Sequence, residues 1–579
     1  MLAALQCFIA SLGLGSLPMK RSCWTLLALA ALAALASART LVAAEAPLEP
    51  PIPGEAEEAA ERVGSTADHS QFGVLEGPFE SGQEVTQACL SCHTEAAEQV
   101  QRSIHWTWRY EQPETGQALG KRNVVNNLCI GLAGNYPRCT SCHTGYGWED
   151  ADFDFSAEER VDCLVCHDTT GEYVKLPTGA GHPPYEDTES QGKTFEAPDL
   201  AHVAQNVGET SLETCGSCHF EGGGGDAVKH GDLDSSLLDP PRSLDVHMSE
   251  AGGGFSCSDC HAFSGHIQGG SRYHVSMPDY EDSPLAAHPQ DKPACVACHG
   301  SEPHEPGLHD KLNAHGELIA CQTCHVPEIA RGGLSTKTVW DWSEAGRMGP
   351  DGGRIVERNE QGRVVYDSKK GSFEWAEDYA PTYRWFNGEV SYTLVGDTID
   401  PAGEVPLNRP LGGPDEAGSK IWPFKVIYGR QPYDAGNDHL VVPKLFGSEG
   451  EDAAYWRSYD WDRAIRAGMA EARAIGQTDA DYSGDYGFID TRMYWPVNHM
   501  VAPAEESVAC GECHSPGGRM AGVAGVYVPG EDGHPLIERI GWAAVGLTLL
   551  ATLLHGGLRY YLYRRQRRGG GHNEAERGS

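Results

Sequence analysis

The residues best suited to chemistry in this sequence are cysteines, because sixteen of its nineteen cysteines occur in eight Cys-x-x-Cys-His motifs. Each motif predicts covalent attachment of a c-type haem, with its histidine as the proximal iron ligand. Zinc sites and disulfides are the alternatives, but neither requires a histidine directly after every second cysteine. We therefore expect eight covalently bound haem c groups. The motifs are Cys89-Cys92-His93, Cys139-Cys142-His143, Cys163-Cys166-His167, Cys215-Cys218-His219, Cys257-Cys260-His261, Cys295-Cys298-His299, Cys321-Cys324-His325 and Cys510-Cys513-His514.

The histidines outside the motifs supply candidates for the second axial ligand. Of the 25 histidines, 8 belong to the motifs, which leaves 17. An electron-transfer haem is commonly closed by a second histidine, and no pattern of methionines indicates His/Met ligation here. The candidate distal ligands are His69, His105, His230, His247, His266, His274, His304, His309, His315 and His499.

Two further features do not belong to the haem motifs. Cys129 stands ten residues before Cys139, outside the N-terminal apolar segment. It is either an inert buried thiol or a thiol made reactive by nearby positive charge. The second feature is a run of four glycines followed by Asp226 and Lys229, in which the glycines allow the backbone to approach a flat cofactor. If a helix begins there, Asp226 and Lys229 share a face; the alternative is a solvent loop with a surface lysine.

The elements that position these residues are expected to be short. Gly and Pro together make up 105 residues (70 and 35), and only 40% of the chain is hydrophobic. We predict a mainly α and irregular, loop-rich multihaem cytochrome c built around its eight haems, with a small β-containing haemless segment and a C-terminal transmembrane helix. Short strands are expected at 354–356, 363–366 and 390–395, and helical periodicity covers 455–475. Attachment sites that are close in sequence, Cys139 with Cys163 and Cys295 with Cys321, are expected to bring porphyrins into near contact.

Both ends of the chain carry targeting signals. Lys20 and Arg21 precede an apolar run and small-residue cleavage patterns, as in a secretion signal, with Met19 as an alternative start. The apolar run at 540–558 is followed by tyrosines and arginines, which predicts a periplasmic domain anchored in the inner membrane; an amphipathic or buried helix is the alternative. The predicted parts are a signal peptide (1–44), an acidic linker (45–66), a seven-haem region with the catalytic site (67–329), a haemless β/α segment (330–505), the eighth haem site (506–518), a linker (519–538), a transmembrane helix (539–563) and a basic cytoplasmic tail (564–579).

The net charge of −38 restricts the partners. Nucleic acid is excluded, because the chain would repel the phosphate backbone. A small inorganic anion remains a possible substrate, but the protein would have to create a local positive site against its own global field.

The chain resembles the octahaem tetrathionate reductase family over residues 66–515. The resemblance rests on the eight motifs, on the segment 105–108 (His-Trp-Thr-Trp), on Asn126-x-x-Cys129 upstream of 139–148, on 163–168 and on 222–232. In that family a lysine amine is the distal ligand of the second haem, where catalysis occurs. The resemblance thus implies a catalytic haem on Cys139 and Cys142, with Lys229 as its ligand and with Asn126, Cys129 and Asp226 lining the cavity.

The implied activity is reduction of tetrathionate to thiosulfate, with nitrite or hydroxylamine as other substrates. Electrons would come from a quinol-linked or cytochrome donor through bis-histidine haems. Two alternatives remain: an electron conduit without a substrate of its own, and an enzyme similar to hydroxylamine oxidoreductase, which uses a tyrosine cross-linked to its porphyrin. The matched lysine favours the reductase.

Overall fold

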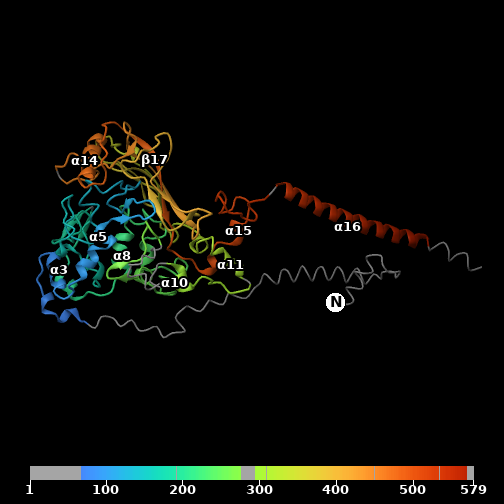
Figure 1. The fold of residues 1–579 in the computed structure, drawn as a ribbon, viewed down its shortest axis with the longest axis horizontal. Helices are drawn as coiled ribbons and strands as arrows, with labels where there is room; N and C mark the ends of the chain where they lie inside the picture. The colour runs from blue at the N-terminus through green and yellow to red at the C-terminus, as the bar shows by residue number, and fades with distance from the viewer. Residues whose placement is uncertain are drawn as a thin grey trace, which may run out of the picture. The chain divides into compact units, whose positions relative to one another are not determined.

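The computed structural model describes residues 67–275 and 294–569, apart from the single positions 191, 308, 449 and 534. The predicted signal peptide and acidic linker, and the end of the basic tail, lie outside the described residues. The described chain has three structurally different parts: a region of short helices, a region built on a large β-sheet, and a long C-terminal helix (Figure 1).

Short helices carry almost every attachment motif. The two cysteines and the histidine of a motif stand at positions i, i+3 and i+4, so one helical turn points all three toward the same porphyrin. Seven motifs overlap such a helix, whereas Cys139–His143 lies in turns. The helices of this region are α3 (Gly82–Leu90), α4 (Ala96–Gln101), α5 (Ile104–Thr107), α6 (Leu164–His167), α7 (Leu200–Gln205), α8 (Leu212–His219), α9 (Cys257–Cys260), α10 (Cys295–His299), α11 (Asp310–His315) and α12 (Gln322–His325), followed much later by α15 (Cys510–Cys513).

The β-sheet is much larger than the small β segment that the sequence predicts. It has nine strands, with β13-β17-β15-β7-β10-β9-β8 in order and with β11 and β16 also paired to β15. Strands β15 and β17 are antiparallel over eleven residue pairs. The strands are β7 (Thr336–Asp341), β8 (Val356–Arg358), β9 (Val364–Asp367), β10 (Gly371–Ala376), β11 (Thr382–Phe386), β13 (Val405–Pro406), β15 (Lys420–Asp434), β16 (His439–Leu440) and β17 (Tyr486–Pro496). Four small two-stranded sheets are β1 (Tyr110–Glu111) with β2 (Ala118–Leu119), β3 (Thr188–Ser190) with β4 (Lys193–Phe195), β5 (Phe263–Ser264) with β6 (Ile267–Gln268), and β12 (Val390–Tyr392) with β14 (Asn408–Pro410).

The three predicted strands correspond to β8, β9 and β12, but the two longest strands were not predicted. Strand β15 contains Pro423, Gly429 and Pro432, residue types that ordinarily argue against the interior of a strand. The predicted helix at 455–475 forms as two helices, α13 (Tyr455–Ser458) and α14 (Trp461–Ala474), because Tyr459 adopts a left-handed conformation with φ of 55° between them.

The main hydrophobic core lies in the sheet region. Strands β7, β15 and β17 and the buried face of α14 contribute to one cluster, in which Ala464, Ile465 and Met469 of α14 pack on the sheet residues. The remaining clusters of buried residues are small. The motif-bearing region therefore has little aliphatic core of its own, as expected for a chain whose haems add apolar mass.

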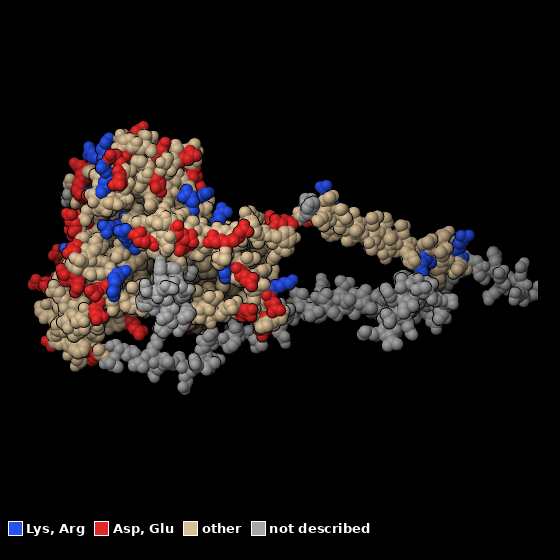
Figure 2. Space-filling view, in the orientation of Figure 1, with Lys and Arg blue, Asp and Glu red and all other residues tan. Residues whose placement is uncertain are grey.

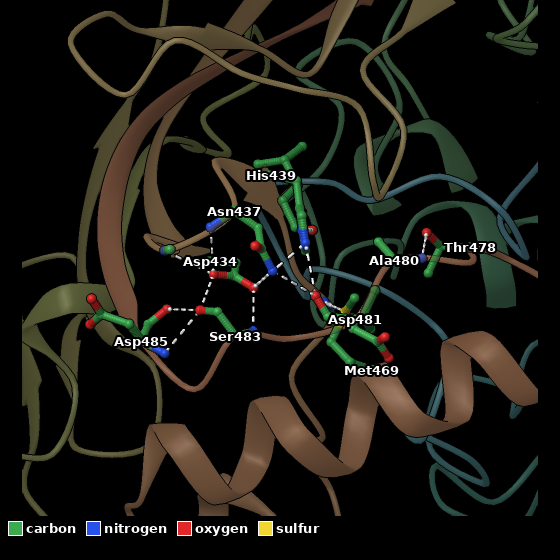
Figure 3. Close-up of polar contacts among 12 residues, drawn as sticks. Asp434, Asn437, His439, Met469, Thr478, Ala480, Asp481, Ser483 and Asp485 are labelled. Carbon is green, nitrogen blue, oxygen red and sulfur yellow. Dashed lines mark hydrogen bonds and ion pairs between the residues drawn. The ribbon is translucent and has the colours of Figure 1, made fainter.

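A buried carboxylate fixes the end of the sheet where β15 leads into β16 (Figure 3). Asp434 accepts hydrogen bonds from the backbone N–H groups of Gly436 (3.0 Å) and Ser483 (2.7 Å). His439 lies 3.5 Å from the same carboxylate and also hydrogen bonds the carbonyl of Asp481. These contacts tie the segment before β17 to the turn after β15, so they set the register of the two longest strands.

Helix α16 (Pro535–Gly569) contains the predicted transmembrane segment 539–563. Residues Leu536–Gln566 form a stretch of 31 residues that contains an apolar window of mean hydropathy 1.5, and none of that window is buried against the rest of the described chain. By length and composition α16 can cross a membrane, and its exposed side chains need an apolar environment that the protein does not provide.

We expect a chain ending at residue 533 to leave the membrane fraction and remain soluble without losing haem. The apolar window of α16 is not buried against other described residues, so its removal leaves their packing intact. The measurement is the distribution of haem absorbance between membrane pellet and supernatant, with the full chain as control. A truncated chain that still sediments with membranes would contradict the role of α16 as the anchor.

Candidate functional site

Seven motif histidines each face a second histidine at nearly the same separation. Two imidazoles that share one metal ion, with metal–nitrogen bonds of about 2 Å on each side, place their ring centroids about 6 Å apart. The observed separations fall between 6.0 and 6.4 Å. The residues therefore fit a haem iron between each pair. The pairs are His93 with His69, His219 with His105, His167 with His266, His261 with His499, His299 with His247, His325 with His304 and His514 with His315.

Hydrogen bonds orient several of these rings through Nδ1. The Nδ1 atoms of His167, His261 and His514 lie 2.8–3.0 Å from backbone carbonyl oxygens of Gly208, Gly269 and Pro529. Among the distal histidines, His266 is held by Gln99, His304 by Asn313 and His499 by the buried Asp232. A ring that donates from Nδ1 leaves the Nε2 lone pair for a metal, which is the arrangement that outer-shell partners commonly impose on metal-ligating histidines.

The pKa values of the cysteine thiols show which attachment sites are neighbours. Contact with a cysteine of another motif is the largest influence on four thiols and lowers their pKa: Cys163 acts on Cys89, Cys218 on Cys142, Cys257 on Cys215 and Cys295 on Cys321. Burial chiefly raises the pKa of Cys166, Cys260 and Cys324, and the nearby thiols of Cys215, Cys298 and Cys513 add to that rise.

These neighbours form one continuous path. It runs from the first attachment site through the third, fourth, fifth, sixth and seventh to the eighth, and the second site branches from the fourth. The nearness of Cys295 and Cys321 agrees with their short separation in sequence. Near contact of the porphyrins on Cys139 and Cys163 stays a prediction: the N–H of Asp162 donates to the carbonyl oxygen of Thr144 (2.9 Å), so the second and third sites are adjacent along the backbone.

The second motif differs from the other seven. His143 is fully buried and has no histidine opposite it among the described residues. Its Nε2 donates to the carbonyl oxygen of Trp106 (2.8 Å), while its Nδ1 has no hydrogen-bond partner in the described chain. Trp106, Trp108 and Trp148 surround the ring with centroids 4.8–5.4 Å away. The second attachment site is therefore the one at which the described residues offer no second imidazole opposite the motif histidine.

Lys229 lies near this second attachment site. Its Nζ stands 4.9 Å above the ring of Trp495, on β17. A Cβ added to Gly222 would lie 3.0 Å from the Lys229 side chain, so the glycine run allows the lysine to pack on the backbone. Burial is the main cause, and the cations of Arg272 and Lys121 a further cause, of a pKa of Lys229 well below its usual range. The neutral amine, which can bind a metal, is therefore the favoured form.

Cys129 and Asn126 lie together in a tight turn. The side chain of Asn126 accepts hydrogen bonds from the N–H groups of Leu128 and Cys129 (2.9 Å each) and donates to the carbonyl of Ile130. Asn126 thus shapes the turn that presents Cys129. The thiol of Cys129 lies 3.5 Å from the carbonyl oxygen of Gly223, on the same glycine run that packs against Lys229.

Asp226 does not share a helical face with Lys229, because residues 221–229 form turns. Its carboxylate accepts a hydrogen bond from the backbone N–H of Ser235 (3.0 Å) and another from the Ser235 hydroxyl. In this geometry Asp226 closes the loop that carries Lys229.

The large sheet holds both loops in place. The ammonium of Lys425, on β15, is fully buried and donates to the carbonyl oxygens of Val228 and Lys229 (3.1 Å each). Asn127 donates to the carbonyl of Ile427 on the same strand, and the indole of Trp342 donates to Leu128. These contacts show that the haemless segment positions the residues of the candidate site.

Three candidate distal histidines face no motif histidine. His230 packs edge-on against Trp495 at 5.4 Å. His274 lies 3.3 Å from Glu389, and His309 precedes α11. Residues that sequence reasoning missed include Arg272, Lys425 and Trp495. None of them belongs to a recognisable motif, and only the pairing of distant strands and loops brings them to Lys229.

The attachment motifs and the histidine pairs define a c-type multihaem cytochrome, which is a class of redox proteins with covalent haem c. Residues 88–168 match the family described as "Cytochrome c554 and c-prime", and residues 337–517 match "Cytochrome c bacterial". Among solved structures, the chain is similar to an octaheme cytochrome c from Shewanella oneidensis, with 40% identity, a TM-score of 0.69, and coverage of 79% of this chain and 97% of the other. The chain belongs to the octahaem cytochrome c family. The curated proteins provide no match.

Replacing a paired histidine should open one centre, whereas replacing an unpaired one should not. We expect His247→Ala to remove one bis-histidine low-spin signal, because His247 lies 6.0 Å from His299. His309→Ala serves as the matched control and should leave the spectrum unchanged. The measurement is low-temperature EPR of the oxidised protein at equal haem content. Loss of the same signal in both variants would contradict the pairing.

Proposed function

We propose that this octahaem cytochrome is a reductase whose catalytic centre is the haem attached to Cys139 and Cys142. One observation supports it above all: the described chain offers a pair of imidazoles at seven attachment sites, but at the second site no second imidazole faces His143. An electron conduit needs every iron closed by strong ligands on both faces, whereas an enzyme needs one position at which a substrate can bind. The haem held at this site would supply electrons to that substrate.

In this proposal Lys229 is the protein ligand of the catalytic iron. Burial favours its neutral amine, and the carbonyls of Val228 and Lys229 are fixed by Lys425, so the backbone at the ligand is preorganised. His143, the histidine of the same motif, would be the other protein ligand of that iron, so the amine of Lys229 would have to be displaced before a substrate can bind.

Tetrathionate reduction to thiosulfate is the activity that we propose for this site, with nitrite and hydroxylamine as other substrates. Cys129 can take part by thiol–disulfide exchange. Its thiolate would attack a central sulfur of tetrathionate, form a Cys–S–S–SO₃⁻ adduct and release one thiosulfate; two electrons from the haem array would then cleave the adduct, release the second thiosulfate and restore the thiolate. The sulfur lies beside the glycine run that also packs against Lys229, which supports a shared site.

Substitution of Lys229 by histidine should close the centre with an imidazole. We expect Lys229→His to keep the full haem content but lower tetrathionate turnover by about 100-fold or more, since the substrate loses a preorganised site. Lys193→His, a change of the same chemistry at an exposed lysine on β4, is the control. Turnover would be followed with a reduced viologen dye as donor. If Lys229→His reduces tetrathionate at the normal rate, Lys229 is not the ligand of the catalytic centre.

We further propose that the protein is anchored in the inner membrane, with its haems in the periplasm, and receives electrons from a membrane quinol-linked donor at the eighth haem. His514 donates from Nδ1 to the carbonyl of Pro529 (2.9 Å), and α16 begins at Pro535. Six residues span at most about 20 Å, so this haem site must lie close to the start of the anchor. It is also one end of the path of attachment sites.

This donor route can be separated from catalysis by the choice of reductant. We expect His315→Ala, which removes the partner of His514, to lower quinol-driven turnover in membrane vesicles and to spare turnover driven by a soluble viologen. Equal losses with both donors would indicate general damage to the array, and equal activity with both would exclude the eighth haem as the point of electron uptake.

A further inference from the structure

The side chain of Arg272 lies beside Lys229, over the same indole ring of Trp495. The guanidinium carbon of Arg272 lies 5.1 Å from the ring centroid of Trp495, and Lys229 Nζ lies 4.9 Å from it. Arg272 also lies over the ring of Tyr273 (4.7 Å) and donates to its hydroxyl. The guanidinium of Arg272 and the amine of Lys229 therefore converge on one indole next to the second attachment site.

Within residues 67–275 and 294–569, no carboxylate forms an ion pair with Arg272 or Lys229. The influences on the pKa of Arg272, after burial, come only from Tyr273 and Tyr392, and those on Lys229 come from Arg272, Lys121 and Cys142. No salt bridge to either side chain forms among the described residues. A buried, unpaired cation costs free energy, so a site that keeps one is expected to have a ligand of opposite charge.

The indole of Trp495 adds an unused donor. Trp495 is 2% exposed, and its Nε1–H finds no acceptor within the described part of the chain. Buried indole N–H groups ordinarily have a hydrogen-bond partner. The unpaired donor is thus a second observation, independent of charge, that indicates a ligand with acceptor oxygens at this place.

The backbone of Arg272 is fixed before any ligand binds. Ser271 and His274 exchange two backbone hydrogen bonds (2.8 and 3.2 Å), so Arg272 and Tyr273 form the tip of a tight turn. The turn is tied to a neighbouring segment by the N–H of Val275, which donates to the carbonyl of Gly388, and by His274, which contacts Glu389. Such a turn can hold a guanidinium in place at little entropic cost on binding.

We propose that Arg272, with the indole N–H of Trp495, binds the anionic oxygens of the substrate beside Lys229. This inference rests on the proposed reductase function and specifies its substrate class as oxyanions. Arg272 has five N–H donors in a planar fork, and the Tyr273 hydroxyl accepts from only one of them. A sulfonate group of tetrathionate or the two oxygens of nitrite suit that fork, whereas hydroxylamine, which is mainly neutral at pH 7, gains nothing from the charge.

The surface of the protein makes such a local site necessary. Acidic side chains are spread over the visible face of the described residues, and the full chain carries a net charge of −38 (Figure 2). This negative field repels an anion, but dissolved salt screens the repulsion beyond about 10 Å at 0.1 M ionic strength. A partly buried arginine without a carboxylate partner can therefore determine binding at close range.

The test compares substrates of different charge in Arg272→Gln. We expect KM for tetrathionate and nitrite to rise by about tenfold or more, as is typical on loss of a charge-assisted contact, with KM for hydroxylamine unchanged. Arg272→Lys should give a smaller rise, because it keeps the charge and loses the fork. The matched control is Arg430→Gln, an exposed arginine paired with Asp490 on β17. Equal rises for the charged and neutral substrates would overturn the proposal.

A binding measurement separates this proposal from the proposed activity. Thiosulfate would be titrated into the oxidised full-length protein and followed by its optical difference spectrum. If the wild-type protein binds thiosulfate and Arg272→Gln binds it about tenfold more weakly, the anion site stands even when no substrate is turned over. The same arginine could instead pair with a haem propionate. A shift in one haem potential in Arg272→Gln, with thiosulfate binding unchanged, would show that pairing and overturn the proposal.

Discussion

The constraint on which this structure depends is the separation of two imidazoles that fit one haem iron between them. Each pair joins a motif to a histidine elsewhere in the chain, and the two partners can be far apart in the sequence. His261 pairs with His499, and His219 pairs with His105. The haem-bearing region has only small hydrophobic clusters, so these pairs and the covalent attachments do the work that a large core does elsewhere. Short helices suffice, because each needs to orient only one turn.

The large sheet positions the loops at the second attachment site, where no second histidine faces the motif histidine among the described residues. The turn with Cys129 and the loop with Lys229 are irregular, and irregular loops are ordinarily mobile. Here Lys425, Asn127 and Trp342 connect them to β15 and to the turn that directly follows β7. The burial of Lys425 lowers its pKa to about 7, and its hydrogen bonds to two carbonyls and a hydroxyl compensate for the loss of water. A rigid sheet thus gives the candidate site a precision that the loops alone could not.

Much of this arrangement could be predicted from local sequence, and the reasons for the remainder are physical. The motifs and the apolar helix depend on spacing within a few residues, and seven of the ten candidate distal histidines do face a motif histidine. The two longest strands were not predicted, because Pro423, Gly429 and Pro432 in β15 are residue types that ordinarily argue against the interior of a strand. The aromatic surroundings of His143 also could not be predicted, because the motif is identical to the other seven and Trp106 and Trp148 come from other segments.

Lys229 and Arg272, the two basic side chains above Trp495, differ in chemistry and suit different roles in the proposed site. A lysine can lose its proton when it is buried, and the cations near Lys229 strengthen that tendency, so the amine becomes available as a ligand. An arginine keeps its proton under the same conditions, so Arg272 retains the charge that an anion requires. The neighbouring arginine also helps to keep the lysine neutral, since two adjacent ammonium-type charges would repel each other. In the proposed site, metal ligation and anion recognition would therefore be coupled through one pair of side chains.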